Sequence, residues 1–152
     1  MKKILVIGAG RSAVTLIKYL LDNSIANNWI VTVADFSIEL AERAVANHEN
    51  GKAIFFNVTD EIQRKSEIEN ADIVISMLPA SLHITVAKDC ISLAKNLVTA
   101  SYVSPEIADL DEKAKQAGVL LLNEIGLDPG IDHMSAMRVI DEIKENGGEL
   151  TS

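Results

Sequence analysis

The stretch "KILVIGAGRSA", residues 3–13, decides which fold the sequence predicts. An apolar run leads into G-x-G-x-x-A, from Gly8 to Ala13, and a helical pattern follows it. In such a loop Gly8 permits a tight turn, Gly10 lets the backbone approach a pyrophosphate, and Ala13 keeps the helix close to the sheet. The start of the helix offers free N–H groups and partial positive charge to phosphates. The stretch therefore predicts a dinucleotide-binding loop between a first strand and a first helix.

An acidic residue ends the next predicted strand, in "VTVADFS", residues 31–37. A carboxylate at Asp35 can accept hydrogen bonds from both hydroxyls of an adenosine ribose. It would also repel a 2′-phosphate, by about 4 kcal/mol for unit charges about 4 Å apart at an effective dielectric near 20. Asp35 therefore favours NAD as the cofactor, with NADP as the alternative. A second interpretation makes Asp35 only the cap of a helix that begins near Ser37.

Short apolar runs alternate with helical patterns along the whole chain. Six runs are typical of strands covered on both faces: 3–8, 29–35, 52–58, 71–78, 96–101 and 118–124. Apolar residues recur at helical spacing between them, and Ser104-Pro105 predicts the cap and first position of one of these helices. The pattern predicts an α/β fold, a doubly wound parallel sheet of the Rossmann type with about six strands and helices on both faces.

Ligands in such a sheet lie along the carboxyl ends of the strands, so further candidates are sought there. The residues at these ends are Asn57-Val58, Met77 to Ala80 with Leu78 and Pro79 between them, Ala100 to Tyr102 with Ser101, and Glu124 to Asp128. Arg11 of the glycine loop could contact a phosphate, and it equally fits a solvated arginine at a helix start. His83, which follows Pro79 on a predicted helix, is interpreted as a packing or capping residue.

Composition bounds the class of protein. The chain has 152 residues, 48% of them apolar, which is enough for one domain with a real core. No apolar run approaches the roughly 20 residues of a membrane span, so no membrane partner is expected. The net charge of −8 argues against nucleic acid as a partner. A single cysteine, Cys90, fits a reducing, cytoplasmic location, and no His/Cys cluster has the spacing of a metal site.

The chain ends in "ENGGELTS", residues 145–152, in which two glycines follow a predicted helix. Glycines at this place are typical of a helix stop. We therefore expect a dinucleotide-binding domain over 1–148. We expect 149–152 to begin a substrate or catalytic domain that this chain does not contain.

The segment "NEIGLDPGIDH", residues 123–133, has both a structural and a functional interpretation. In the first, Gly126 ends a strand, Asp128 caps a helix and Pro129 takes the first helical position. In the second, the position of Asp128 at the carboxyl edge of the sheet makes it part of the site. We favour a site role for Asp128 and a structural role for Asp132 and His133.

Three strings, "MLPASLHITVAKDCI", "VTASYVSPE" and "NEIGLDPGIDHMSAM", resemble saccharopine dehydrogenases of the L-glutamate-forming type. The resemblance implies an NAD(P)-dependent oxidoreductase of lysine metabolism that acts on a CH–NH bond. Its reaction interconverts saccharopine with L-glutamate and 2-aminoadipate 6-semialdehyde. The resemblance also implies that Asn57, Val58, Leu78, Pro79 and Ser101 contact the cofactor, together with Arg11 and Ser12 of the glycine loop. It places Ser101, Tyr102 and Asp128 where nicotinamide meets the substrate. It makes Asp128 a candidate for proton transfer or for holding the substrate amine, and Tyr102 a candidate hydrogen-bonding partner.

The chain differs from the fungal members of that family at two places, and two alternative functions also fit the sequence. NADP-using fungal relatives look basic just after the second strand, where this chain has Asp35-Phe36, and they carry an aromatic residue where it has Ala80. One alternative is a related reductase of another amino-acid imine, such as carboxynorspermidine synthase. The other is a non-catalytic nucleotide-binding module. The expected partner is a small amino-acid substrate, and a homodimer is one expected assembly.

Overall fold

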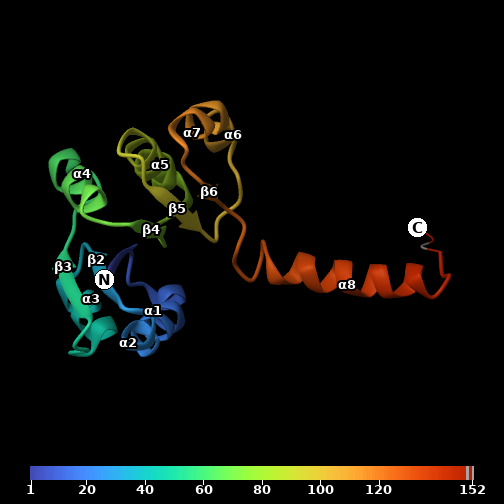
Figure 1. The fold of residues 1–152 in the computed structure, drawn as a ribbon, viewed down its shortest axis with the longest axis horizontal. Coiled ribbons are helices and arrows are strands. Elements are labelled where there is room, and N and C mark those ends of the chain that lie inside the picture. The colour runs from blue at the N-terminus through green and yellow to red at the C-terminus, as the bar shows by residue number, and fades with distance from the viewer. Residues whose placement is uncertain (150, 152) are drawn as a thin grey trace.

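Six strands form one parallel sheet in the computed structural model, which describes residues 1–149 and 151 (Figure 1). The strands are β1 (Lys2–Ile7), β2 (Trp29–Asp35), β3 (Gly51–Phe55), β4 (Ile73–Ser76), β5 (Asn96–Thr99) and β6 (Leu121–Leu122). Their order in the sheet is β3-β2-β1-β4-β5-β6, and every neighbouring pair is parallel. This is the strand order of a Rossmann fold, so the predicted fold class is confirmed.

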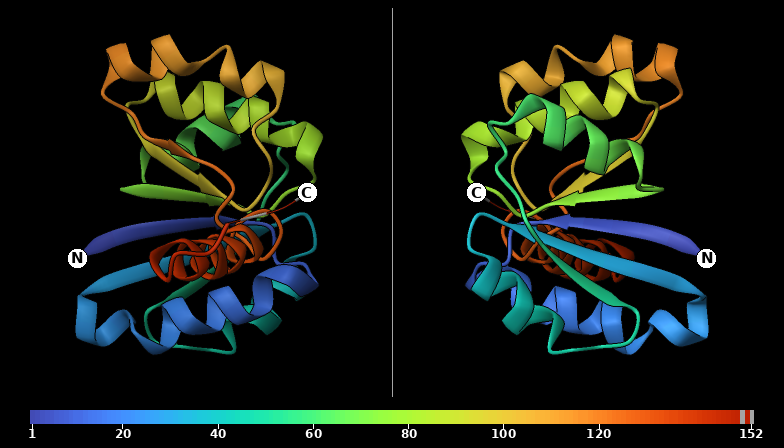
Figure 2. Two further views of the ribbon diagram at one scale, coloured as in Figure 1. Left: turned by 90° about the vertical axis from the view of Figure 1, so that its right-hand side faces the viewer. Right: turned by 90° about the vertical axis from the view of Figure 1, so that its left-hand side faces the viewer.

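Helices cover both faces of the sheet (Figure 2). The helical segments are η1 (Arg11–Ala13), α1 (Val14–Asp22), α2 (Ser24–Asn27), α3 (Ile38–Val45), α4 (Glu61–Glu69), η2 (Ala80–Leu82), α5 (His83–Ser92), α6 (Pro105–Ala108), α7 (Asp111–Ala117) and α8 (Ile131–Glu145). One face carries α1 and α3, and the opposite face carries α4, α5, α6 and α7. The change of face lies between β3 and β4, as the strand order requires.

The central strand β1 explains why its sequence is continuously apolar. Ile4 and Val6 pack in the core on the α1 and α3 side, whereas Leu5 and Ile7 pack in the core under α4 and α5. All four side chains are buried. Because successive residues of a strand point to opposite faces, a strand with helices on both sides needs apolar residues at every position.

Several elements are shorter than the sequence predicts. The last strand, β6, has only two residues, and β3 ends at Phe55, before Asn57 and Val58. The helix expected from residue 105 is divided into α6 and α7 by a turn at Asp109 and Leu110. Both parts pack on α5, and the turn keeps Leu110 buried. The predicted cap is present, since the Ser104 hydroxyl accepts a hydrogen bond from Ile107 N at 3.3 Å.

The final helix, α8, leaves the sheet and extends away from it (Figure 1). It has no buried residue, and most of its large apolar side chains are exposed. The expected start of a second domain at 149–152 includes residues 150 and 152, which lie outside the described residues. Within residues 1–149 and 151, no helix has the length and apolar character needed to cross a membrane.

Candidate functional site at the carboxyl ends of the strands

A crevice lies at the carboxyl ends of β4 and β5, beside the start of the first helix. It consists of two adjoining hollows of about 430 Å³ and about 350 Å³, and both are lined by Ser12, Met77, Thr99 and Ala100. The larger one reaches Tyr102 and Asp128. The chain leaves β1 and β4 in opposite directions here, and this switch point is where ligands bind in open α/β sheets. Position and size both fit a small-molecule site.

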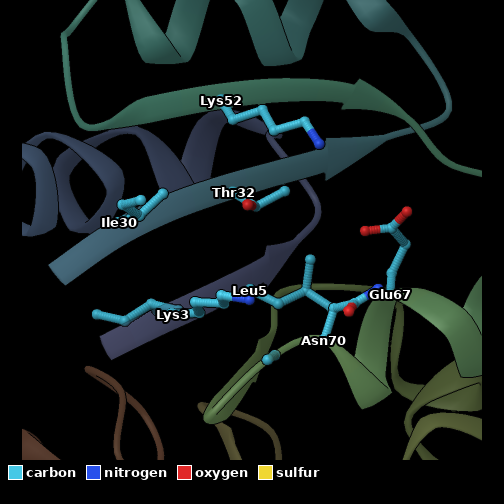
Figure 3. A pocket seen from close by; sticks show the side chains of 9 residues that line it. Lys3, Leu5, Ile30, Thr32, Lys52, Glu67 and Asn70 are labelled. Atoms are coloured by element: carbon cyan, nitrogen blue, oxygen red, sulfur yellow. The ribbon is translucent and has the colours of Figure 1, made fainter. Parts of the chain in front are cut away.

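Another hollow, of about 300 Å³, lies on the α4 side of the sheet near the starts of β1, β2 and β3 (Figure 3). Lys3, Lys52 and Glu67 border it, together with apolar residues of the strands. It includes none of the predicted site residues and lies away from the carboxyl ends of the strands. It therefore lies outside the predicted cofactor site.

The glycine loop has two different glycines. Gly8 has φ +106°, and a Cβ on it would lie 2.8 Å from the Met77 carbonyl oxygen, so a larger residue is excluded there. Gly10 has an ordinary φ of −65°, and a Cβ on it would meet nothing within 4 Å. The protein itself therefore does not require glycine at position 10. The open space fits the predicted approach of a pyrophosphate. Ala13 is fully buried, as close packing of helix and sheet requires.

The start of the first helix has unused hydrogen-bond donors. The helix opens with the 3₁₀ turn η1, and Ala13 N donates to Gly10 O at 2.9 Å. Among the hydrogen bonds within the described residues, none is donated by the backbone N–H of Gly10, Arg11 or Ser12. Unpartnered N–H groups at a helix start are the standard site for a phosphate. These residues therefore fit a dinucleotide diphosphate.

Asp35 ties the glycine loop to the end of β2. Its carboxylate accepts hydrogen bonds from Ala9 N at 2.6 Å and from Ser37 N at 2.8 Å. The cap of α3 is Ser37, whose hydroxyl accepts from Leu40 N at 3.3 Å, so the interpretation of Asp35 as the helix cap is wrong. Carboxylate oxygens have lone pairs for additional donors, so Asp35 can still accept hydrogen bonds from ribose hydroxyls.

Two phenylalanines beside Asp35 were not among the predicted site residues. Phe36 follows Asp35, and Phe55 pairs with Asp35 across β2 and β3. Their rings lie 5.5 Å apart between centroids at 50°, and both are exposed, Phe36 by 70%. An exposed aromatic pair beside an acid that is predicted to bind ribose is suited to contact a base. The signal in the sequence was an aromatic residue directly after the acid.

Asn57 and Val58 lie beyond β3 and do not line the two hollows. The Asn57 side chain accepts hydrogen bonds from the backbone and hydroxyl of Thr59. The Val58 carbonyl accepts from Arg64 Nη1 at 2.5 Å, and Arg64 also forms a buried ion pair with Asp89 at 2.6 Å. These contacts give both residues local structural roles. Leu78 does line the larger hollow, whereas Pro79, the exposed N-cap residue of η2, lines neither hollow.

His83 bonds to side chains at the ends of two strands, which its interpretation as a packing or capping residue did not include. It is the first residue of α5 and is buried. Its Nδ1 lies 2.8 Å from Ser76 Oγ, and its Nε2 lies 2.8 Å from Ser101 Oγ. Burial lowers the pKa of His83, which favours the neutral imidazole. The sequence did contain a signal for these contacts, because serine and threonine follow the apolar runs of β4 and β5.

Tyr102 and Asp128 meet at the outer end of the larger hollow. The Tyr102 hydroxyl donates to Asp128 Oδ1 at 2.6 Å, although the residues are far apart in the chain. This hydrogen bond to a carboxylate raises the pKa of Tyr102, because the neutral phenol is the donor. The sequence named both residues as candidates, and the structure brings them together.

The predicted helix cap at Asp128 is wrong. The helix α8 begins at Ile131, with Gly130 as its N-cap, so Pro129 is not the first helical residue. A compact loop precedes the helix, in which Gly126 N donates to Pro129 O at 2.9 Å and Ile131 N donates to Gly126 O at 3.0 Å. No helical N–H of the described residues donates to Asp128, and its carboxylate accepts a hydrogen bond from Tyr102 instead.

Asp132 and His133 serve the start of α8. Asp132 Oδ1 accepts a hydrogen bond from Gly130 N at 2.9 Å and lies 2.8 Å from His133 Nδ1. Both contacts are local and fit the expected structural role. In the part of the chain that the structure describes, no group of three or more His, Cys, Asp or Glu side chains could hold a metal ion.

Comparison with known proteins identifies the family. The family model described as the saccharopine dehydrogenase NADP binding domain matches residues 4–122. The chain therefore belongs to the saccharopine dehydrogenase family. A saccharopine dehydrogenase [NADP(+), L-glutamate-forming] from Pyricularia oryzae is 39% identical over 98% of the chain and 32% of its own length. An alpha-aminoadipic semialdehyde synthase from Arabidopsis thaliana is 44% identical over 80% of the chain and 12% of its own length.

A solved structure extends this match to the fold. The apo saccharopine dehydrogenase (L-Glu forming) from Saccharomyces cerevisiae superimposes with a TM-score of 0.89 at 37% identity. The match covers 100% of this chain and 33% of that one. The chain thus spans about a third of the length of the fungal saccharopine dehydrogenases that it matches.

Proposed function

We propose that residues 1–148 are the cofactor-binding domain of an oxidoreductase that interconverts saccharopine with L-glutamate and 2-aminoadipate 6-semialdehyde. The observation that carries the proposal is the crevice at the switch point, which is bordered by Ser12, at the start of the first helix, and by the Tyr102–Asp128 pair. Family membership supports the reaction class. Residues 149–152 would then begin the substrate domain, and relatives about three times as long as this chain have room for such a domain.

The dinucleotide would be held differently along its length. The backbone from Gly8 to Ser12 would bind the diphosphate, and Ala13 would keep the helix close enough for this contact. Asp35 would accept hydrogen bonds from the adenosine ribose. When bound, the cofactor supplies the hydride chemistry.

We further propose NAD as the preferred cofactor of this chain, although the names of its fungal relatives specify NADP(+). The carboxylate of Asp35 would lie beside a 2′-phosphate and repel it. The donors that already bind Asp35 are uncharged backbone N–H groups, so they do not cancel its negative charge.

At the other end of the crevice, Tyr102 and Asp128 would act on the substrate. A carboxylate that accepts a hydrogen bond from a phenol is suited to hold a protonated amine or to receive its proton. Tyr102 would keep the Asp128 carboxylate in place through their 2.6 Å hydrogen bond. Leu78, Pro79 and Ser101 would border the nicotinamide. The substrate is then a small amino acid, and the single buried cysteine supports a cytoplasmic location.

Calorimetric titration of the purified, folded chain with NADH and NADPH tests this proposal. We expect NADH to bind at least about tenfold more tightly than NADPH, because the unfavourable charge contact applies only to the 2′-phosphate. Equal or tighter binding of NADPH would contradict the assigned preference. Binding of neither dinucleotide to a folded sample would contradict the proposed function as a whole.

A further inference from the structure

A cluster of buried polar side chains lies beneath the nicotinamide end of the crevice. Ser76, His83 and Thr99 are 0%, 3% and 2% exposed. Ser76 and Thr99 face each other in the register of β4 and β5. Buried polar groups cost free energy unless they are hydrogen-bonded, and all three of these are. A structural core would more cheaply use apolar residues at these positions, as β4 does at Val74 and β5 does at Leu97.

Ser76, His83, Thr99 and Ser101 all line the larger hollow, and His83 links the other three by hydrogen bonds. Its two ring nitrogens each lie 2.8 Å from a serine hydroxyl, Ser76 on the buried side and Ser101 on the crevice side. Thr99 Oγ1 lies 3.4 Å from the same His83 nitrogen that contacts Ser101, and it also accepts a hydrogen bond from Ser101 N at 3.3 Å. Ser101 lines the larger hollow beside Tyr102 and Asp128. The contacts around Ser101 therefore restrict its hydroxyl on the side away from the crevice.

The imidazole also determines which hydrogen-bonding role Ser101 presents. A neutral imidazole has one donor and one acceptor nitrogen. With the proton on Nε2, Ser101 accepts that hydrogen bond and its own O–H is free for the crevice. With the proton on Nδ1, Ser101 donates to His83, and only its lone pairs face the crevice. The tautomer of His83 thus decides whether Ser101 acts as a donor or an acceptor towards a ligand.

We propose that His83 is a positioning residue that, through its bond to Ser101, holds the Ser101 hydroxyl in one orientation towards the nicotinamide carboxamide. A carboxamide has both a hydrogen-bond donor and an acceptor. A hydroxyl that is held as a donor, or held as an acceptor, would therefore favour one orientation of the nicotinamide ring. This inference rests on the proposed function, since it assigns the nicotinamide to this end of the crevice. The His83 side chain is buried, and its proposed role is exerted through its hydrogen bond to Ser101.

Comparing NADH with ADP-ribose separates this role from a structural one. ADP-ribose shares the adenosine and diphosphate of NADH but has no nicotinamide ring. In calorimetric titrations, His83→Gln should weaken NADH binding by about tenfold, the effect of one misplaced hydrogen bond, and leave ADP-ribose binding within about twofold. His48→Gln, the same change at a half-buried histidine beyond α3, should alter neither affinity. An equal loss of both ligands in His83→Gln would overturn the inference.

The double variant tests whether His83 acts through Ser101. We expect Ser101→Ala to lower NADH affinity about as much as His83→Gln does, and we expect the double variant to bind like Ser101→Ala alone. Independent, additive losses would overturn the inference. If the parent chain binds neither NADH nor ADP-ribose, the proposed function itself fails. That result differs from a parent chain that binds both ligands and a His83→Gln variant that keeps the same ratio of NADH to ADP-ribose affinity, which would overturn only the inference about His83.

A measurement on unaltered His83 covers the case in which its variants do not fold. In chain labelled with ¹⁵N-histidine, the ring nitrogens report tautomer and protonation by NMR. We expect a neutral His83 as one dominant tautomer, and we expect Ser101→Ala to shift the Nε2 signal. Ring signals that are identical in parent and Ser101→Ala chain would show that the bond is not formed, and would overturn the inference.

Discussion

The two ends of the proposed dinucleotide site are built in different ways. At the adenosine end, the features that fit a cofactor are mostly backbone: the turn at Gly8, the open space above Gly10 and the free amides at the start of the helix. At the nicotinamide end, they are side chains from distant segments, with His83 bonded to Ser101 and Tyr102 bonded to Asp128. The first end is therefore encoded by a short motif, whereas the second exists only after the sheet has formed. Variants should distinguish the two ends.

Gly10→Ala should have the largest effect, and only on binding. A Cβ at Gly10 meets nothing within 4 Å and its φ is ordinary, so stability should be unchanged or slightly higher. The methyl group would enter the space assigned to the diphosphate, and we expect NADH affinity to fall by about 100-fold, as a lost charge-assisted contact and a steric conflict together would cause. Calorimetry with thermal unfolding measures both quantities.

Gly118→Ala is the matched control for that variant. Gly118 ends α7 with φ +66° and has open space around it, far along the chain from the glycine loop. Alanine in this conformation should cost about 1 kcal/mol of stability and leave NADH affinity intact. If Gly10→Ala bound NADH like the parent, the diphosphate could not lie above Gly10.

Asp35→Ala should change cofactor preference. Loss of the ribose contact should weaken NADH binding by about tenfold. NADPH should bind as well as before or more tightly, because the repulsion between Asp35 and the 2′-phosphate is gone. Asp35 also accepts two backbone hydrogen bonds, so a stability loss of about 1–3 kcal/mol should accompany the change.

The control for Asp35 is Asp72→Ala. Asp72 likewise accepts a backbone hydrogen bond, from Lys3 N at 2.7 Å, but at the amino-terminal ends of the central strands β1 and β4. The Asp72→Ala variant should leave the ratio of NADH affinity to NADPH affinity unchanged. If Asp35→Ala had the same ratio of NADH to NADPH affinity as the parent chain, Asp35 would not contact the ribose.

Phe36→Ala should have a smaller effect, confined to the adenosine end. Base stacking on an aromatic side chain contributes about 1–3 kcal/mol, and the exposure of Phe36 places the expected loss at the lower limit, about fivefold. NADH and ADP-ribose should be affected equally. Ile62→Ala, an exposed apolar residue of α4, is the control. A loss limited to NADH would place Phe36 at the wrong end of the crevice.

Asp128→Asn should leave NADH affinity within about twofold and act instead on Tyr102. Without the acceptor carboxylate, the pKa of Tyr102 should fall from its raised value. The chain has two tyrosines, so an ultraviolet pH titration in a Tyr19→Phe background follows Tyr102 alone. Because the folded-state pKa is raised, the stability this bond contributes is complete below the unfolded pKa of about 10 and is lost as pH rises through the folded pKa. An unchanged phenol titration would contradict the pairing.

The sequence was sufficient for the fold and for the glycine turn after β1. The alternation of apolar runs with helical stripes predicts the parallel sheet, and β2 has the predicted bounds. The Gly8 to Ala13 spacing identifies the turn because those residues act through local backbone conformation.

The sequence was less informative where position depends on tertiary packing. The role of His83 depends on hydroxyls of β4 and the segment after β5, which only strand pairing brings together. The cap assigned to Asp128 failed because the Gly126 to Gly130 loop delays the helix to Ile131. Neither contact has a local sequence pattern. Short elements such as β6 are likewise set by their neighbours.

Amide chemical-shift mapping with NADH tests the central claim most directly, because it reports where the dinucleotide binds in the unaltered chain. The account predicts the largest shifts at Gly10, Arg11 and Ser12, with further shifts at Asp35 and Ser101, and none around the hollow at Lys3 and Lys52 in Figure 3. Shifts centred on that hollow, or a folded chain with no shifts at saturating NADH, would contradict it.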